Sequence, residues 1–133
     1  MFLILVVFPA YCMAQIPADS AKNYFNQNVE VCGKVIGISA SAQMNNNKGA
    51  MYVVLDFGNR IGNKKNVVFS AQFPAQQNFA SADADKKYWE DQENKYVDST
   101  VCAKGLITLW GTQYGSGKIP MMKLESQDNL RYK

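Results

Sequence analysis

Eight aromatic and cationic residues provide most of the binding chemistry that this sequence offers. They combine rings, on which a base or a sugar can stack, with side chains that can pair with phosphate. These residues are Lys48, Tyr52, Arg60, Lys64, Lys65, Trp110, Tyr114 and Lys118. In the alternative interpretation, the two loop aromatics only close the end of the core and the paired lysines form an ordinary polar turn. The residue types alone leave both interpretations open.

The acidic residues give little support for catalysis. The chain contains no histidine, so the commonest general base and the commonest zinc ligand are both missing from it. Glu30 and Asp56 alternate with apolar residues, and no nucleophile or base stands beside them in the sequence. Asp83 and Asp85 lie in a lysine-containing segment, where we interpret them as residues that cap a helix. We therefore expect no enzymatic activity, no cofactor and no metal site.

Two of the three cysteines occur in matching contexts, Val-Cys-Gly-Lys at 31–34 and Val-Cys-Ala-Lys at 101–104. The third, Cys12, lies in an apolar run at 1–14 that ends in small residues and is too short to span a bilayer comfortably. We expect a signal peptide that is cleaved after Ala14, with no stable membrane insertion of the mature chain. The alternatives are an uncleaved anchor, a lipoprotein site or a buried first strand.

Cleavage would leave residues 15–133 as one periplasmic or secreted domain with two cysteines, Cys32 and Cys102. An even number of cysteines in an exported chain allows one disulfide, and two separate thiols are the alternative. The whole chain has 133 residues, 47% of them apolar and 19% charged, which is typical of one globular core. Its net charge of +3 permits a polyanionic partner but is smaller than in most dedicated DNA-binding domains.

Alternating apolar residues predict five strands and one substantial helix. The strands are expected at 28–39, 51–57, 67–73, 100–109 and 118–125. A helix is expected within 75–98, capped by Ser81 or Asp83, and a short opening helix at 16–27. Gly33 and Gly37 indicate a bulge or bend in the first strand. The segments 40–50, 58–66 and 110–117 are expected to be loops, and 129–133 a frayed tail.

Three strands, a helix and two more strands form the element order of the oligonucleotide/oligosaccharide-binding (OB) fold. We therefore expect a mainly β, five-stranded barrel with a helix between strands three and four. The chain also resembles a family of small exported bacterial OB-fold proteins. Four segments carry this resemblance: VCGKV at 31–35, YVVLDFG at 52–58, VCAKGLI at 101–107 and YGSGKIPMMKL at 114–124. The family is generally described as nucleic-acid-binding-like, and the loops 40–50 and 58–66 depart from its pattern.

The OB fold assigns places to the candidate residues. Its first and fourth strands pair antiparallel, so Cys32 and Cys102 would lie opposite each other. Its usual ligand face is the outer surface of strands two and three, flanked by the loops that follow strands one and four. The eight aromatic and cationic residues would lie on or beside that face. We expect weak binding of single-stranded nucleic acid or an oligosaccharide, and the alternative is a protein-interaction or envelope-stress accessory protein with no nucleic-acid role.

Overall fold

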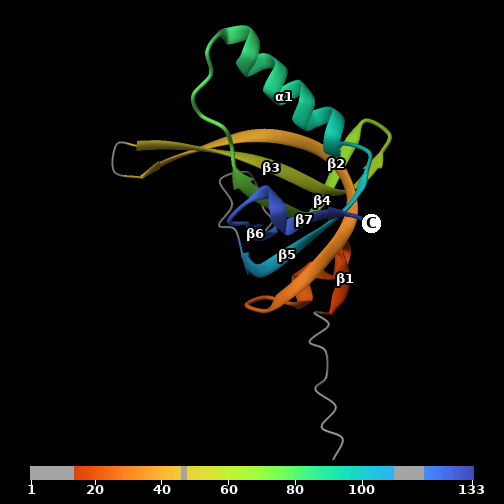
Figure 1. The fold of residues 1–133 in the computed structure, drawn as a ribbon. Helices are drawn as coiled ribbons and strands as arrows, with labels where there is room; N and C mark the ends of the chain where they lie inside the picture. The colour runs from red at the N-terminus through yellow and green to blue at the C-terminus, as the bar shows by residue number, and fades with distance from the viewer. Residues whose placement is uncertain (1–13, 46–47, 110–118) are drawn as a thin grey trace, which may run out of the picture.

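The computed structural model describes residues 14–45, 48–109 and 119–133, and this part of the chain is mainly β-structure. Figure 1 shows strands from both halves of the chain interleaved, with one α-helix outside them. The elements in chain order are β1 (Gln15–Pro17), the 3₁₀ helix η1 (Ala18–Asn23), β2 (Asn28–Asn45), β3 (Lys48–Ile61), β4 (Lys64–Pro74), α1 (Ala82–Tyr96), β5 (Thr100–Leu109), β6 (Pro120–Lys123), the 3₁₀ helix η2 (Gln127–Asn129) and β7 (Leu130–Tyr132).

The strands close into a ring because β2 pairs at both of its edges. The order β2–β3–β4–β6–β5 returns to β2 through an additional β2–β5 pairing. The β4–β6 pair is parallel, whereas the other four pairs of the ring are antiparallel. The short terminal strands add to this ring: β1 runs parallel to β2, and β7 runs antiparallel to β5.

The predicted strand count was too low, and the place of the helix in that count was wrong. The five expected strands correspond to β2–β6, and the structure adds β1 and β7. As a result α1 lies between β4 and β5, not between the third and fourth strands. The opening helix expected at 16–27 is instead β1 followed by η1, and the expected frayed tail contains β7. Three-residue strands show no periodicity in a sequence, because only their tertiary partners stabilise them.

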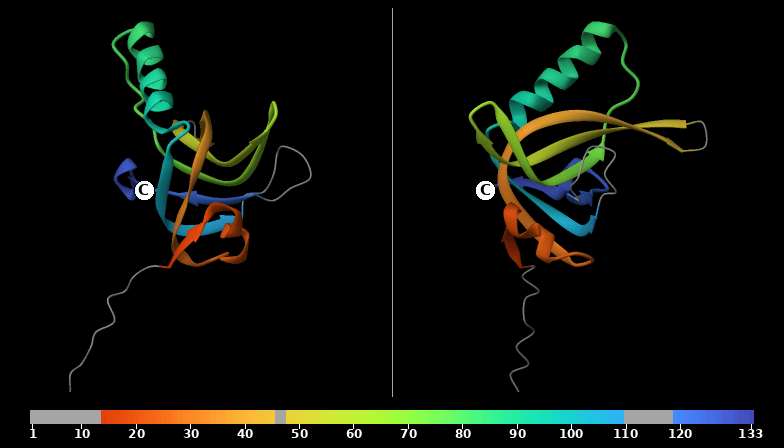
Figure 2. Two further views of the ribbon diagram at one scale, coloured as in Figure 1. Left: turned by 90° about the vertical axis from the view of Figure 1, so that its right-hand side faces the viewer. Right: turned by 180° about the vertical axis from the view of Figure 1, so that it is seen from behind.

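Two hairpins extend beyond the ring, as the views in Figure 2 show. In one of them, β2 and β3 continue through most of the segment expected as a loop at 40–50. The other joins β3 to β4 with a turn at Gly62, whose φ of 62° is left-handed. The bend predicted for the first strand is present, since the β2–β3 register shifts between Val35 and Gly37.

The interior of the ring is a continuous apolar core that contains residues from every strand of the ring. Phe57 and Phe69 pack together at its centre, with ring centroids 5.2 Å apart. The C-terminal end of α1 contributes Tyr96, whose ring meets Phe73 edge-on at 6.1 Å. Ser81 caps the start of α1 by accepting a hydrogen bond from the Ala84 amide, which confirms one of the two predicted caps. No helix in the described residues is both long and apolar enough to cross a membrane.

Candidate ligand face

Strand alternation divides β3 and β4 into a core side and an outer side. Val53, Leu55 and Phe57 of β3 are fully buried in the core. The intervening residues of β3 and their register partners on β4 lie on the opposite side of the sheet. We call this surface the outer face and define it by Tyr52, Val54, Asp56, Ser70 and Gln72. Val54, Ser70 and Gln72 are buried, so only Tyr52 and Asp56 are partly exposed.

A polar pair lies at the centre of the outer face. The register places Asp56 opposite Ser70, and the Ser70 hydroxyl donates a hydrogen bond of 2.9 Å to Asp56 Oδ1. Burial raises the pKa of the Asp56 carboxyl above its ordinary value of 3.8, although the bond from Ser70 and the charge of Lys65 act in the opposite direction. This carboxylate therefore tends to hold its proton more strongly than an exposed aspartate does.

Gln72 lies beside this pair on β4 and is only 1% exposed. Its side-chain nitrogen and oxygen both lack a hydrogen-bond partner within the described structure. An unpaired buried polar group costs about 1–3 kcal/mol of folding free energy. The sequence contains only an indirect indication of this site: polar Ser70 and Gln72 alternate with Phe69, Ala71 and Phe73.

The β3–β4 hairpin brings three of the predicted ligand residues together at one end of the outer face. Arg60, Lys64 and Lys65 are all exposed. The Arg60 guanidinium donates a hydrogen bond of 2.5 Å to the carbonyl oxygen of Ile36, which holds it against β2. A register shift between Phe57 and Gly58 precedes these residues and sets the direction of the hairpin.

Of the other five predicted ligand residues, only Tyr52 has a side chain in the described part of the structure. Tyr52 lies half-buried on β3, near the opposite end of the outer face from the hairpin cations. Lys48 is the first residue of β3, but its side chain lies outside the described part of the structure. Trp110, Tyr114 and Lys118 also lie outside the described residues.

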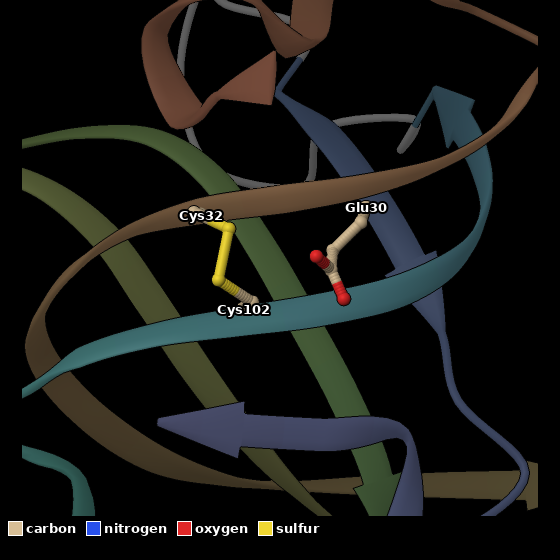
Figure 3. A group of neighbouring side chains, drawn as sticks. All are labelled: Glu30, Cys32 and Cys102. Atoms are coloured by element: carbon tan, nitrogen blue, oxygen red, sulfur yellow. A yellow bond between two sulfur atoms is a disulfide. The ribbon is translucent and has the colours of Figure 1, made fainter. Parts of the chain in front are cut away.

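A second cluster lies where β2 pairs with β5 (Figure 3). Cys32 and Cys102 are directly opposite in the strand register, and their sulfur atoms lie at disulfide distance, 2.04 Å. One ligand atom each from Glu30 and the two cysteines lie within 4.8 Å of one another, a spacing that could suit a metal ion. Sulfur atoms that are bonded to each other are not free thiolates, so we interpret this cluster as structural.

Glu30 has its own partners in this cluster. Arg131 of β7 donates two hydrogen bonds to its carboxylate, at 2.9 and 2.5 Å, and Gln15 of β1 donates a third at 3.0 Å. The bonds from Arg131 are the main reason why the pKa of Glu30 lies below its ordinary value of 4.5. The same network ties both terminal strands to β2. Sequence reasoning missed it, because neither terminal strand was expected.

Comparison with known proteins assigns the chain to no family. No protein-family model matches it, and no curated protein matches it. It is similar to a solved structure of a proposed aspartyl-tRNA synthetase from Leishmania major, with a TM-score of 0.49 and 11% identity over 98% of this chain. The chain spans only 23% of the length of that protein. It is also similar to a proposed nucleic acid-binding lipoprotein from Klebsiella pneumoniae, with a TM-score of 0.41, 14% identity, and coverage of 87% of this chain and 77% of the other.

Proposed function

We propose that this protein is an OB-type binding module that holds a single-stranded nucleic acid or an oligosaccharide across its outer face. One observation carries the proposal: along β3 and β4, the half-buried ring of Tyr52 lies at one end of the outer face, the cationic hairpin lies at the other end, and the partly exposed Asp56 lies between them. The ring of strands, with a helix before β5, supports the OB assignment.

The proposed roles follow from the chemistry of each group. Tyr52 offers a stacking surface that suits either a base or a sugar ring. The Asp56 carboxylate can accept hydrogen bonds from ligand hydroxyl or amino groups, and the buried Ser70 hydroxyl holds that carboxylate in place. The hairpin cations can pair with phosphate. Lys48, Trp110, Tyr114 and Lys118, which sequence analysis assigned to the flanking loops or the strands beside them, remain part of the proposal.

We also propose a role in binding rather than catalysis, in the periplasm or outside the cell. The cysteine pair at disulfide distance supports an oxidising compartment, because disulfides are rare in the cytosol. In this proposal residues 1–14 are the signal peptide and residues 15–133 the working domain.

Fluorescence anisotropy of the mature chain with two labelled probes tests the proposed function. The probes are a single-stranded oligonucleotide and an uncharged oligosaccharide. Tyr52→Ala should weaken binding of the true ligand by about 5- to 150-fold, equivalent to the loss of about 1–3 kcal/mol of stacking on one base. Tyr52→Phe keeps the ring and should bind like the natural protein.

Tyr132→Ala is the matched control, since it removes an exposed tyrosine from β7, which pairs with β5 and not with the outer-face strands. It should leave affinity unchanged. If neither probe binds at low salt, the proposal is wrong and a protein partner becomes the better hypothesis. Equal losses in Tyr52→Ala and Tyr132→Ala would show that the outer face is not the binding surface.

A further inference from the structure

One edge of β2 carries no partner strand over the second half of its length. Along residues 28–34 this edge pairs with β5, and Val35 still bonds to the backbone of Asp98 and Ser99. Beyond that point β2 pairs only with β3, on its other edge. Within the described residues, no group outside the β2–β3 pair hydrogen-bonds to the backbone of residues 38–42. The free edge therefore presents a row of unpaired N–H and C=O groups.

This edge lacks the features that usually prevent a strand from pairing with another chain. Charged side chains, proline and short length are the common protections. Residues 35–47 contain no Lys, Arg, Asp, Glu or Pro, and β2 continues to Asn45. The register shift between Val35 and Gly37 bends β2, but it lies before the free stretch. The free edge is therefore open to a further strand.

Helix α1 turns the free edge into one side of a groove. Figure 1 shows α1 on the side of β2 that lies away from β3. The groove has a volume of about 340 Å³ and is lined by residues 38–40 of β2 and by Lys86, Trp89, Glu90 and Glu93 of α1. Residues 39 and 40 are an exposed serine and alanine, whose short side chains leave the backbone accessible. An extended peptide can add to a sheet edge of this kind while its side chains contact the neighbouring element.

The helix side of the groove is acidic on a chain that is otherwise basic. Residues 75–99, which connect β4 to β5, contain three of the 14 Lys and Arg and six of the 11 Asp and Glu. This segment has a net charge of −3, and the rest of the chain +6. In the groove, Lys86 and Glu90 form an ion pair at 3.8 Å, whereas Glu93 forms none with any described residue. A cationic side chain is the complementary partner for Glu93.

We infer that an extended, basic peptide segment of a partner protein pairs with the free edge of β2 and lies in the groove beside α1. Its backbone continues the β2–β3 sheet, and one of its cationic side chains meets Glu93. This interaction is separate from the proposed function, because the groove uses none of the residues that define the outer face.

A second copy of this chain is the competing occupant, since two open edges can pair with each other. Two observations favour a single peptide strand. A neighbour at the free edge must fit between β2 and α1, and a whole folded domain is wider than one strand. A symmetric pair would also bring the acidic α1 segments of both copies to one interface, where their charges repel.

Hydrogen exchange of the full mature chain with a designed peptide measures strand addition directly. The probe is a labelled peptide of alternating lysine and valine, about eight residues long, which is a usual strand length. On binding, every second amide of residues 38–42 should exchange more slowly, because alternate N–H groups of a strand point to the same edge. The same peptide with a fully N-methylated backbone keeps the side chains and the charge but cannot donate hydrogen bonds to β2. It should not bind.

Glu93→Lys tests the charge of the groove. The variant should weaken binding of the lysine–valine peptide, measured by anisotropy at physiological salt, by about 3- to 10-fold, because an exposed ion pair is replaced by a repulsion. Asp91→Lys is the matched control, since it makes the same change at an exposed position of α1 that does not line the groove. Its effect should stay below about 2-fold, because salt screens exposed charges that lie farther from the peptide.

The outcomes separate this interaction from the proposed function. Equal binding of the N-methylated peptide, or protection without alternation along residues 38–42, would overturn strand addition. Equal losses in Glu93→Lys and Asp91→Lys would overturn the groove as the site. A dimer that shows the alternating protection without peptide would assign the free edge to a second copy instead. If no peptide binds up to about 1 mM, the inference is wrong, and binding of an oligonucleotide or oligosaccharide on the outer face is unaffected.

Discussion

At the scale of single residues, Asp56 is a partly buried carboxyl group whose ionisation affects the stability of the fold. Its folded-state pKa is raised, mainly by burial, so the ionised form disfavours folding. The protonated carboxyl is the form that favours folding. Its contribution to stability is fully present below pH 3.8, the ordinary pKa of the group, and is lost as the pH rises through the higher pKa of the folded state. Asp56→Asn keeps an acceptor for Ser70 and avoids the buried charge. The variant should therefore have a higher Tm than the natural protein at pH 7, and the difference should disappear below pH 3.8.

The same variant also reports on the ligand. Without the carboxylate, the outer face repels phosphate less, so a nucleic acid should bind more tightly to Asp56→Asn at low salt. An oligosaccharide should bind more weakly, because the carboxylate is the stronger acceptor for sugar hydroxyls. Thermal unfolding at the two pH values and anisotropy with both probes provide these measurements. An unchanged Tm at pH 7 would contradict the stability argument.

At the scale of elements, the β3–β4 hairpin depends on Gly58. A Cβ atom added there would overlap the backbone carbonyl oxygen of Asn66 on the facing strand. Gly58→Ala should lower the free energy of unfolding by about 1–3 kcal/mol, the usual cost of adding atoms to a filled site. The variant should also weaken oligonucleotide binding, because the hairpin cations would move. Gly62→Asn is the control, because its Cβ meets nothing within 4 Å and asparagine tolerates a φ of 62°. Urea unfolding of both variants tests this; equal stabilities would contradict it.

At the scale of the whole molecule, the cysteine pair holds the ring closed. Cys32 and Cys102 join β2 to β5, the pairing that completes the ring, across a sequence separation of 70 residues. Cross-linking a loop of this length restricts the unfolded chain, so Cys32→Ala/Cys102→Ala should lose about 4 kcal/mol of unfolding free energy. Urea unfolding should show a similar loss when the natural protein is reduced. If reductant has no effect and both thiols react with alkylating agents in the native chain, the bond is not formed in solution.

Local patterning was sufficient to predict the strands that build the core. Val29, Val31 and Val35 alternate, and so do Val53, Leu55 and Phe57, because each strand presents one face to the interior. Residues that depend on a distant partner could not be found in this way. Nothing near Asp56 in the sequence indicates Ser70, and nothing near Glu30 indicates Arg131, 101 residues away.

By itself, the sequence determined the mainly β composition, the alternating core and the matching contexts of Cys32 and Cys102. These are short-range properties, which burial and strand geometry impose on neighbouring residues. Only the tertiary structure decided that β1 and β7 are strands, that β4 and β6 pair in parallel, and that Asp56 faces Ser70. Each of these depends on strand register, and register is set by contacts between segments that are separate in the chain.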